Sequence, residues 1–171
     1  QAVYVAYAVQ NRGLSAAQVG ISLGIYGAGM IVGAILAPAI AKQVTFGTLI
    51  LLGPFAGLCA AGVMFATLWL PSAYLVATSF SLFGVGPIIW TISTMTLRQA
   101  VTPNAMLGRV SALIMTATFG ARPIGAAIGA SVAANLGIAA CLGLAATGFL
   151  IQLLVIGFSR VPKLRDISEA V

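Results

Sequence analysis

Arg122 is the residue whose position most needs a chemical explanation, because it stands in the apolar segment TFGARPIGAAIGA, residues 118–130. A guanidinium group keeps its positive charge and presents only hydrogen-bond donors, so it requires acceptors. The two acidic residues of the chain, Asp166 and Glu169, both lie near its C-terminus. We therefore expect Arg122 to be partnered by a backbone carbonyl, by water, by a carboxylate outside this sequence or by an anionic solute.

Other polar or aromatic side chains within the long apolar segments are candidate ligands for a solute. Each of them also suits an ordinary contact between helices, which is the alternative interpretation. If several of them converge on Arg122, they would suit an amphipathic or anionic solute. These candidates are Tyr26, Trp90, Thr91, Thr94 and Gln152.

Catalysis and metal binding have few candidate residues in this chain. It has no histidine, and its two cysteines, Cys59 and Cys141, stand alone in apolar runs without the spacing of a metal site or a disulfide framework. Lys42 falls in a loop, so no serine–lysine pair is embedded in an apolar segment. We expect no enzyme, no cofactor and no metal site.

The composition indicates an integral membrane protein. Charged residues make up 6% of the chain and hydrophobic residues 61%, whereas a soluble domain has about 25% charged residues. A chain with so few charged residues cannot cover a surface that faces water. Most of its exterior must therefore face lipid. The basic residues are scattered between apolar segments rather than gathered with aromatic residues on one surface, which argues against nucleic-acid binding.

Apolar segments about 20 residues long are typical of membrane-spanning helices, and short connections between them indicate antiparallel neighbours. We predict an all-α fold, a polytopic membrane helix bundle over residues 1–158 with a polar cytoplasmic tail at 159–171. The predicted helices cover residues 1–9, 15–41, 48–70, 73–96, 108–134 and 138–158.

The first of these segments is too short to cross a bilayer. Nine helical residues rise about 14 Å, roughly half of a hydrocarbon core of about 30 Å. The chain also begins with Gln1 rather than methionine. We expect the sequence to start within a spanning helix and upstream sequence to be missing.

Arg122 would lie close to the bilayer centre, where an arginine costs about 2.5–3.5 kcal/mol on insertion scales. We therefore expect its helix to be enclosed by other helices or by water rather than bare to lipid.

The basic residues predict the orientation. If the helices alternate in direction, Arg12 lies on one side of the membrane, and six other basic residues satisfy the positive-inside rule on the cytoplasmic side. Trp69 and Tyr74 flank a turn on the outer side, where aromatic belts lie. The cytoplasmic group comprises Lys42, Arg98, Arg109, Arg160, Lys163 and Arg165.

Small residues predict close helix packing, because membrane helices associate where small side chains let their backbones approach. In the second helix Gly20, Gly24 and Gly27 lie on one face, and Gly29 and Gly33 lie roughly on the opposite face. We therefore expect this helix to be sandwiched between protein neighbours. The pair Gly53 and Gly57 and the pair Gly125 and Gly129 have the same G-x-x-x-G spacing.

The segment FGVGPIIW, residues 83–90, interrupts the fourth helix with Gly84, Gly86 and Pro87. A proline removes an intrahelical hydrogen bond and bends the helix. The interruption is either a tolerated kink or part of a gate that lines a cavity.

Two longer stretches of the chain are NRGLSAAQVGISLGIYGAGMIVGAILAP and LRQAVTPNAMLGRVSALIMTATFGARPIGAAIGA. They resemble the C-terminal half of a major facilitator superfamily transporter. Pro103, Gly108 and Arg109 match the P-x-x-x-x-G-R opening of that family's eleventh helix. The resemblance covers nearly the whole chain, is strongest to bacterial drug, macrolide and siderophore exporters, and implies a partial seventh helix and the eighth to twelfth helices.

The resemblance implies a secondary transporter of the efflux type in the bacterial inner membrane. It would move a small amphipathic or anionic solute by alternating access together with a missing N-terminal six-helix half. Proton coupling needs an embedded carboxylate or histidine, which would lie in that half. The alternative is a non-transporting membrane scaffold, or a half-transporter that needs a partner bundle.

The sequence departs from the resembled exporters at the expected cytoplasmic loops. Asn104 and Ala105 stand where those exporters usually carry an acidic residue after the proline, and the loop after the second helix keeps only Lys42 as a charged residue. We therefore expect no locking of these loops by charge pairs in this half.

Overall fold

The computed structural model describes residues 16–70, 72–159 and 161–163, and all the regular structure in these ranges is helical. The predicted helix at residues 1–9 lies outside the described residues. The described helices are α2 (Ala16–Ala41), α3 (Phe46–Ala66), α4 (Ala73–Val101), α5 (Asn104–Phe158) and the short 3-10 helix η1 (Val161–Lys163).

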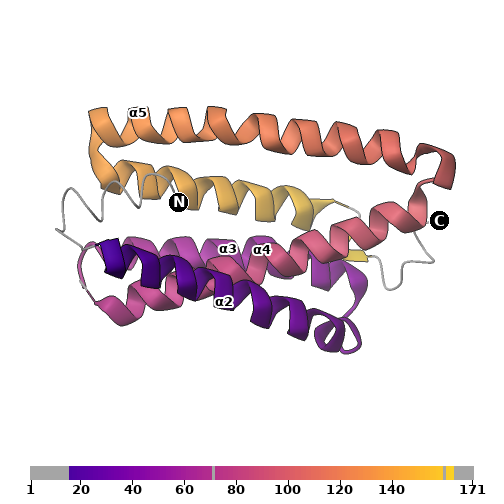
Figure 1. Cartoon of the computed structure of the whole chain (residues 1–171), viewed down its shortest axis with the longest axis horizontal. Coiled ribbons are helices and arrows are strands. Elements are labelled where there is room, and N and C mark those ends of the chain that lie inside the picture. The colour runs from indigo at the N-terminus through magenta and orange to yellow at the C-terminus, as the bar shows by residue number, and fades with distance from the viewer. Residues whose placement is uncertain (1–15, 71, 160, 164–171) are drawn as a thin grey trace.

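Helix α5 consists of two arms. Its backbone leaves helical geometry at Gly137, where φ is 83° and ψ is 171°, and the chain reverses direction there (Figure 1). We call residues 104–136 the first arm and residues 138–158 the second arm. Glycine suits this turn because a side chain disfavours positive φ.

The helices have the length and composition of membrane spans. Gly20–Ala41, Phe46–Ala66, Ala73–Val101 and Asn104–Phe158 are each apolar and long enough to cross a bilayer. Each arm of α5 also reaches the roughly 20 residues that one crossing needs. The predicted all-α polytopic membrane bundle is therefore confirmed.

Helix α4 lies at the centre of the bundle, along both α2 and α3, whereas α2 and α3 have few contacts with each other. The second arm of α5 packs on α3, and the first arm lies outermost beyond it (Figure 1).

Glycines allow α2 to approach α4 at backbone distance. A methyl group added at Gly29 would lie 2.6 Å from the backbone oxygen of Ser81, and one added at Gly33 would lie 2.9 Å from Cα of Val85. Both neighbours are backbone atoms, so only a residue without a side chain fits. Since later residues of α2 meet later residues of α4, the two helices run parallel.

The α3–α4 interface combines glycine contacts with a buried hydrogen bond. A methyl group at Gly86 would lie 2.6 Å from Cβ of Ala56, and one at Gly53 would overlap Cβ of Trp90. The fully buried hydroxyl of Ser79 donates to the carbonyl of Ala60 at 2.8 Å. These contacts hold α3 and α4 together along their central turns.

The other predicted packing glycines have open space around them. A methyl group at Gly20, Gly24, Gly27 or Gly125 would meet no atom within 4 Å among the residues that the structure describes. The second close-contact face of α2 therefore stays a prediction, as does a packing role for Gly125 and Gly129.

Helix ends differ from the predicted ends where polar residues continue a helix. Helix α4 ends at Val101, whereas the sequence predicted its end at residue 96. Helix α5 starts at Asn104, whereas the sequence predicted a start at residue 108. Arg98 and Gln99 have long unbranched side chains that favour helix, so α4 continues through them. The helix ends before Pro103, because a proline disfavours helical geometry in the residue before it.

Helix α3 is also shifted toward the N-terminus relative to its prediction, spanning Phe46–Ala66 instead of 48–70. The side chain of Thr45 caps its start by accepting from the backbone N–H of Thr48, and the Thr67 hydroxyl donates to the carbonyl of Met64 at 2.6 Å where the helix ends.

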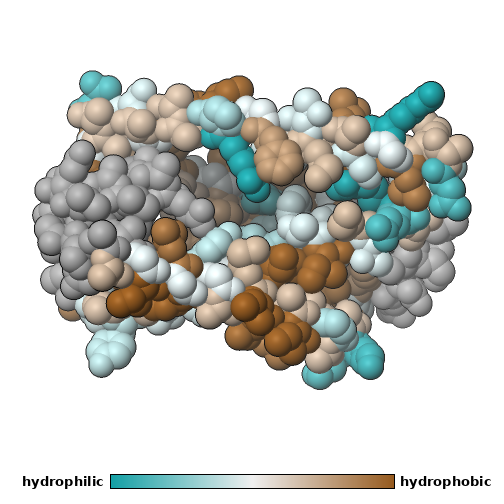
Figure 2. Space-filling view, viewed as in Figure 1, coloured by the Kyte–Doolittle hydropathy of each residue, from teal (hydrophilic) through white to brown (hydrophobic). Residues whose placement is uncertain are grey.

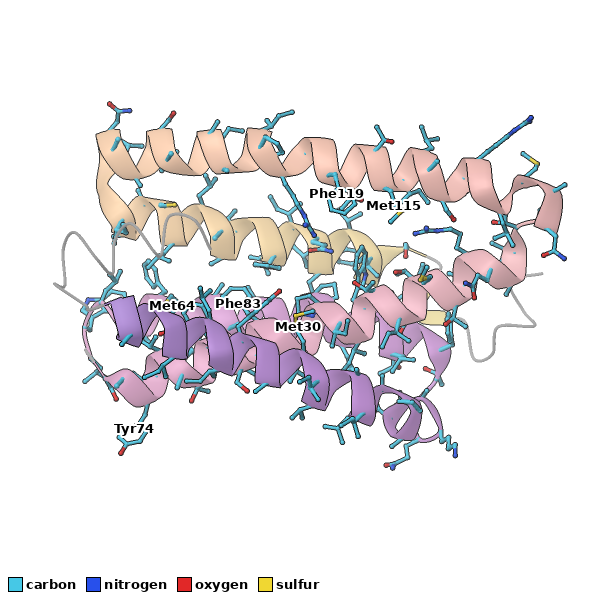
Figure 3. All side chains as sticks on the ribbon, in the orientation of Figure 1. Met30, Met64, Tyr74, Phe83, Met115 and Phe119 are labelled. Carbon is cyan, nitrogen blue, oxygen red and sulfur yellow. The ribbon has the colours of Figure 1, made fainter. Side chains whose placement is uncertain are left out.

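The two ends of the bundle differ in character. Lys42 follows α2, Arg98 lies in the last turn of α4 and Arg109 lies near the start of α5, so these basic residues share one end, where hydrophilic side chains gather in Figure 2. Trp69 and Tyr74 lie at the opposite end and are 69% and 85% exposed; Figure 3 shows Tyr74 pointing outward there.

Candidate binding site at the middle of the bundle

Arg122 lies on the first arm of α5 with its guanidinium carbon 4.9 Å from the ring centroid of Phe119. Met115, Phe119 and Arg122 follow the spacing of one helix face. Met115 and Phe119 project from the first arm toward the remaining helices (Figure 3). The guanidinium, held over the Phe119 ring, therefore lies on the side of this arm that faces the bundle.

Stacking on Phe119 satisfies the Arg122 guanidinium only in part. A cation–π contact contributes about 0.5–2 kcal/mol, which is less than the roughly 2.5–3.5 kcal/mol cost of an arginine at the centre of a membrane helix. A contact with an aromatic ring supplies no oxygen acceptor, so the N–H groups of the guanidinium still require hydrogen-bond acceptors. No ion pair involves Arg122 among the residues that the structure describes, and the sequence from residue 1 to 163 has no aspartate or glutamate.

Gln152 lies at the same depth as Arg122. Each is fifteen positions from Gly137, one on either arm of the α5 hairpin. At a rise of 1.5 Å per residue, both are about 22 Å from the turn. Gln152 is half-buried, while Arg122 is exposed in the described structure.

Trp90 of α4 also lies near this depth. Gly53 of α3 packs against Trp90, and Gly57, one turn further along, packs against Phe149 of the second arm. Gly47 of α3 meets Val161, so α3 and the second arm run antiparallel. The depth of Gly53 and Trp90 therefore corresponds to about residue 153.

We call Trp90, Arg122 and Gln152 the donor layer. It lies close to the middle of the bundle, because Pro87 is the midpoint of α4 (Ala73–Val101) and Trp90 is within one turn of it, about 5 Å along the axis. Three of the predicted ligands thus come from three different helical segments at one depth.

The indole nitrogen of Trp90 is buried and has no hydrogen-bond partner in the described part of the chain. An indole N–H donates and cannot accept. Leaving such a donor unpaired costs about 1–3 kcal/mol. An acceptor that enters the donor layer would recover this energy.

Thr91 and Thr94 lie beside Trp90 on α4, but their hydroxyl protons are already used. Thr91 donates to the carbonyl of Pro87 at 2.7 Å, and Thr94 donates to the carbonyl of Trp90 at 2.8 Å. Such bonds within a helix leave the hydroxyl oxygen only as an acceptor. These two residues are therefore weaker candidates as donors to a solute.

Tyr26 lies away from the donor layer. Its backbone carbonyl packs against Gly84 of α4, and Gly84 precedes Trp90 by six residues, about 9 Å along the helix axis. The described geometry does not bring Tyr26 together with Arg122.

The glycines and the proline of α4 have structural neighbours on two sides. Gly84 faces α2 at Tyr26 and Met30, whereas Gly86 faces α3 at Ala56. Helix α4 continues through Pro87 as a single helix. The close packing of both glycines favours a helix–helix role, and the gate stays a proposal.

The surface is hollowed between the first arm of α5 and the helices beneath it, and side chains of hydrophilic and intermediate hydropathy line part of this hollow (Figure 2). In the described ranges, no three histidine, cysteine, aspartate or glutamate residues come together as metal ligands. The chemistry that this region offers is therefore hydrogen-bond donation, one positive charge and apolar contact.

The sequence interpretation missed Phe119 as a site residue. The signal was present, because an aromatic residue three positions before an arginine on a helix places the ring under the guanidinium. The buried Ser79 was also missed, since its acceptor Ala60 belongs to another helix.

The comparisons with known proteins agree with the fold. A protein-family model described as "Transmembrane secretion effector" matches residues 6–170. The comparisons with curated proteins and with solved structures each gave no match. The matched family is one of transporters and not of enzymes. The chain therefore belongs to the transmembrane secretion effector family of the major facilitator superfamily and is a multi-pass membrane protein.

Proposed function

We propose that the chain forms one helix bundle of an efflux-type secondary transporter that moves a small amphipathic or anionic solute by alternating access. The observation that carries the proposal is the donor layer of Trp90, Arg122 and Gln152 near the middle of an otherwise apolar bundle. Polar and ionisable groups at membrane depth are costly and mark transport pathways. The family assignment supports a transport role independently.

A binding site at mid-depth is reached from either side only if helices move around it. The backbone-close contacts of α4 with α2 and α3 favour motion of these three helices as one rigid unit. We propose that this unit rocks against a second six-helix bundle, the N-terminal half implied by the family frame. A bend of α4 at Gly84, Gly86 and Pro87 is the alternative gate.

We propose that the protein lies in the bacterial inner membrane with its C-terminus in the cytoplasm. The shared location of Lys42, Arg98 and Arg109 at one end of the bundle supports this orientation through the positive-inside rule. The sequence from residue 1 to 163 has no aspartate, glutamate or histidine. If transport is proton-coupled, the proton carrier lies in the second bundle.

A half-transporter or scaffold that assembles with a partner bundle is the second candidate. It is favoured by the first arm of α5, which has no buried residue and exposes apolar side chains on most sides, including Leu113 at 72% and Ile124 at 63%. Lipid alone can cover such a surface, but not the charge of Arg122.

Transport by the full-length protein in proteoliposomes tests the proposal. A panel of radiolabelled anionic, neutral and cationic amphipathic compounds is assayed with an imposed gradient, and we expect accumulation of at least one above empty liposomes. Arg122→Gln should reduce that transport, while Lys42→Gln, which removes a charge at the exposed end of the bundle, should retain it. No transport of any compound would refute the proposed function.

A further inference from the structure

We propose that the donor layer recognises an anionic oxygen group, a carboxylate or a similar oxyanion, attached to an apolar body. In this arrangement Arg122 supplies the charge, and the Trp90 indole and the Gln152 amide donate further hydrogen bonds. The inference deepens the proposed function and rests on it, because it specifies the class of solute that the same site takes.

The first argument is charge balance. Arg122 carries a permanent positive charge at membrane depth, and both acidic residues of the chain, Asp166 and Glu169, lie in the C-terminal tail. The spanning segments of this sequence therefore supply no carboxylate to neutralise it. A bound anion supplies the missing charge, and its two oxygens match the paired N–H groups of a guanidinium.

The second argument is the balance of donors and acceptors. The Arg122 guanidinium and the Trp90 indole donate but do not accept, and the Trp90 nitrogen is buried without a partner in the described structure. A carboxylate, which only accepts, is the group that suits both of these donors, and the amide N–H of Gln152 lies at the same depth as Arg122. A cationic or donor-rich group would leave them unpaired.

The third argument concerns the rest of the solute. Met115 and Phe119 share the helix face of Arg122 and project toward the bundle (Figure 3). The guanidinium carbon of Arg122 lies 4.9 Å from the centre of the Phe119 ring, and the thioether of Met115 adapts readily to apolar shapes. This neighbourhood favours an organic anion with an aromatic or aliphatic body over an inorganic anion.

Fluorescence of Trp90 provides a direct binding assay. The chain has two tryptophans, so Trp69→Phe leaves Trp90 as the only one in this sequence, and any tryptophan of the second bundle is replaced by phenylalanine as well. The full-length protein with this substitution is placed in nanodiscs of zwitterionic lipid, which contribute no net anionic headgroup. It is then titrated with 2-naphthoate, with its neutral analogue 2-naphthamide and with sulfate.

We expect saturable quenching by naphthoate with an affinity about tenfold or more above that of the amide, and weaker binding of sulfate. Arg122→Gln should abolish the preference for the anion, and Arg122→Lys should keep part of it. Phe119→Leu, which keeps every hydrogen-bond donor, should weaken naphthoate binding less than Arg122→Gln does. Helical circular dichroism shows that each variant is folded.

Equal affinity for naphthoate and naphthamide, or an unchanged preference in folded Arg122→Gln, would overturn the inference. Sulfate binding as tight as naphthoate binding would overturn the requirement for an apolar body. In the transport panel, movement of neutral or cationic compounds without anions refutes this inference and leaves the proposed function standing. The absence of transport of all compounds refutes the proposed function instead, whatever the binding preference.

Discussion

The close backbone approach of α2 to α4 at Gly29 gives a prediction whose size follows from the geometry. In Gly29→Ala the new methyl group would lie 2.6 Å from the backbone oxygen of Ser81, 3.2 Å from Cα of Ser81 and 3.3 Å from Cα of Gly84. Side-chain rotation cannot relieve these contacts, because all three atoms belong to the backbone. An ordinary contact begins at 3.4 Å, so the helices must separate locally by about 0.8 Å.

Such a separation weakens the neighbouring contacts along the α2–α4 interface. A radial gap of about 0.5–1 Å forfeits roughly a quarter to a half of a van der Waals contact, and overpacking of this kind typically costs about 1–3 kcal/mol. Replacing glycine by alanine in a helix also adds up to about 1 kcal/mol of stability. Gly62→Ala supplies the control for that gain, since a methyl group at Gly62 meets no described atom within 4 Å.

Reversible unfolding by SDS in mixed micelles, followed by circular dichroism, measures both variants. We expect the free energy of unfolding of Gly29→Ala to lie about 1–3 kcal/mol below that of Gly62→Ala. Equal free energies for the two variants, within about 0.5 kcal/mol, would refute the packing argument.

Two further predictions concern the same bundle and use the same unfolding assay. Ser79→Ala removes the interhelical hydrogen bond to Ala60 and should lower the free energy of unfolding by about 0.6–1.7 kcal/mol. Ser93→Ala should lower it by less, because the Ser93 hydroxyl bonds within its own helix. A larger loss in Ser93→Ala than in Ser79→Ala would contradict this prediction. Gly57→Ala places a methyl group 2.6 Å from the Phe149 ring. Adding Phe149→Leu should therefore restore part of the lost free energy of unfolding, with a favourable coupling energy of about 1 kcal/mol between the two substitutions. Strictly additive effects of the two substitutions would exclude the contact.

The spanning helices could be predicted because lipid imposes a length and an apolar composition on each of them. Their ends were harder to predict. Arg98 and Gln99 look like loop residues by polarity, yet they continue α4, because long unbranched polar side chains also favour helix. Only Pro103, which acts on the backbone, identifies the break.

The glycine pattern was informative in one part of α2 and undecided in another. Gly20 and Gly24 have the same spacing as Gly29 and Gly33, but only the second pair meets a described neighbour, the α4 backbone near Ser81. Sequence spacing shows that a close approach is permitted. It does not show which helix makes it, because the partner lies about 50 residues further along the chain.

The shared depth of two site residues could be predicted, because they lie on the two arms of the α5 hairpin. Arg122 and Gln152 reach the same depth because they are equidistant from the turn at Gly137. The separation of Tyr26 from them was not predictable, since it depends on the parallel alignment of α2 with α4. The use of the Thr91 hydroxyl within its own helix was equally hidden, because a threonine donates to a solute or to its own backbone depending on its rotamer.

Reactivity of an introduced cysteine tests most directly whether position 122 faces a watery hollow inside the bundle. In the full-length protein, Cys59→Ala and Cys141→Ala remove the native thiols of this sequence, any cysteine of the second bundle is replaced by alanine as well, and Arg122→Cys or Ile124→Cys adds one thiol back. Ile124 is 63% exposed and points to roughly the opposite side of the same helix. With a membrane-impermeant methanethiosulfonate we expect Cys at position 122 to react at least about tenfold faster than at 124, since thiolates form in water and not in lipid. Equal rates, or faster reaction at position 124, would contradict the account.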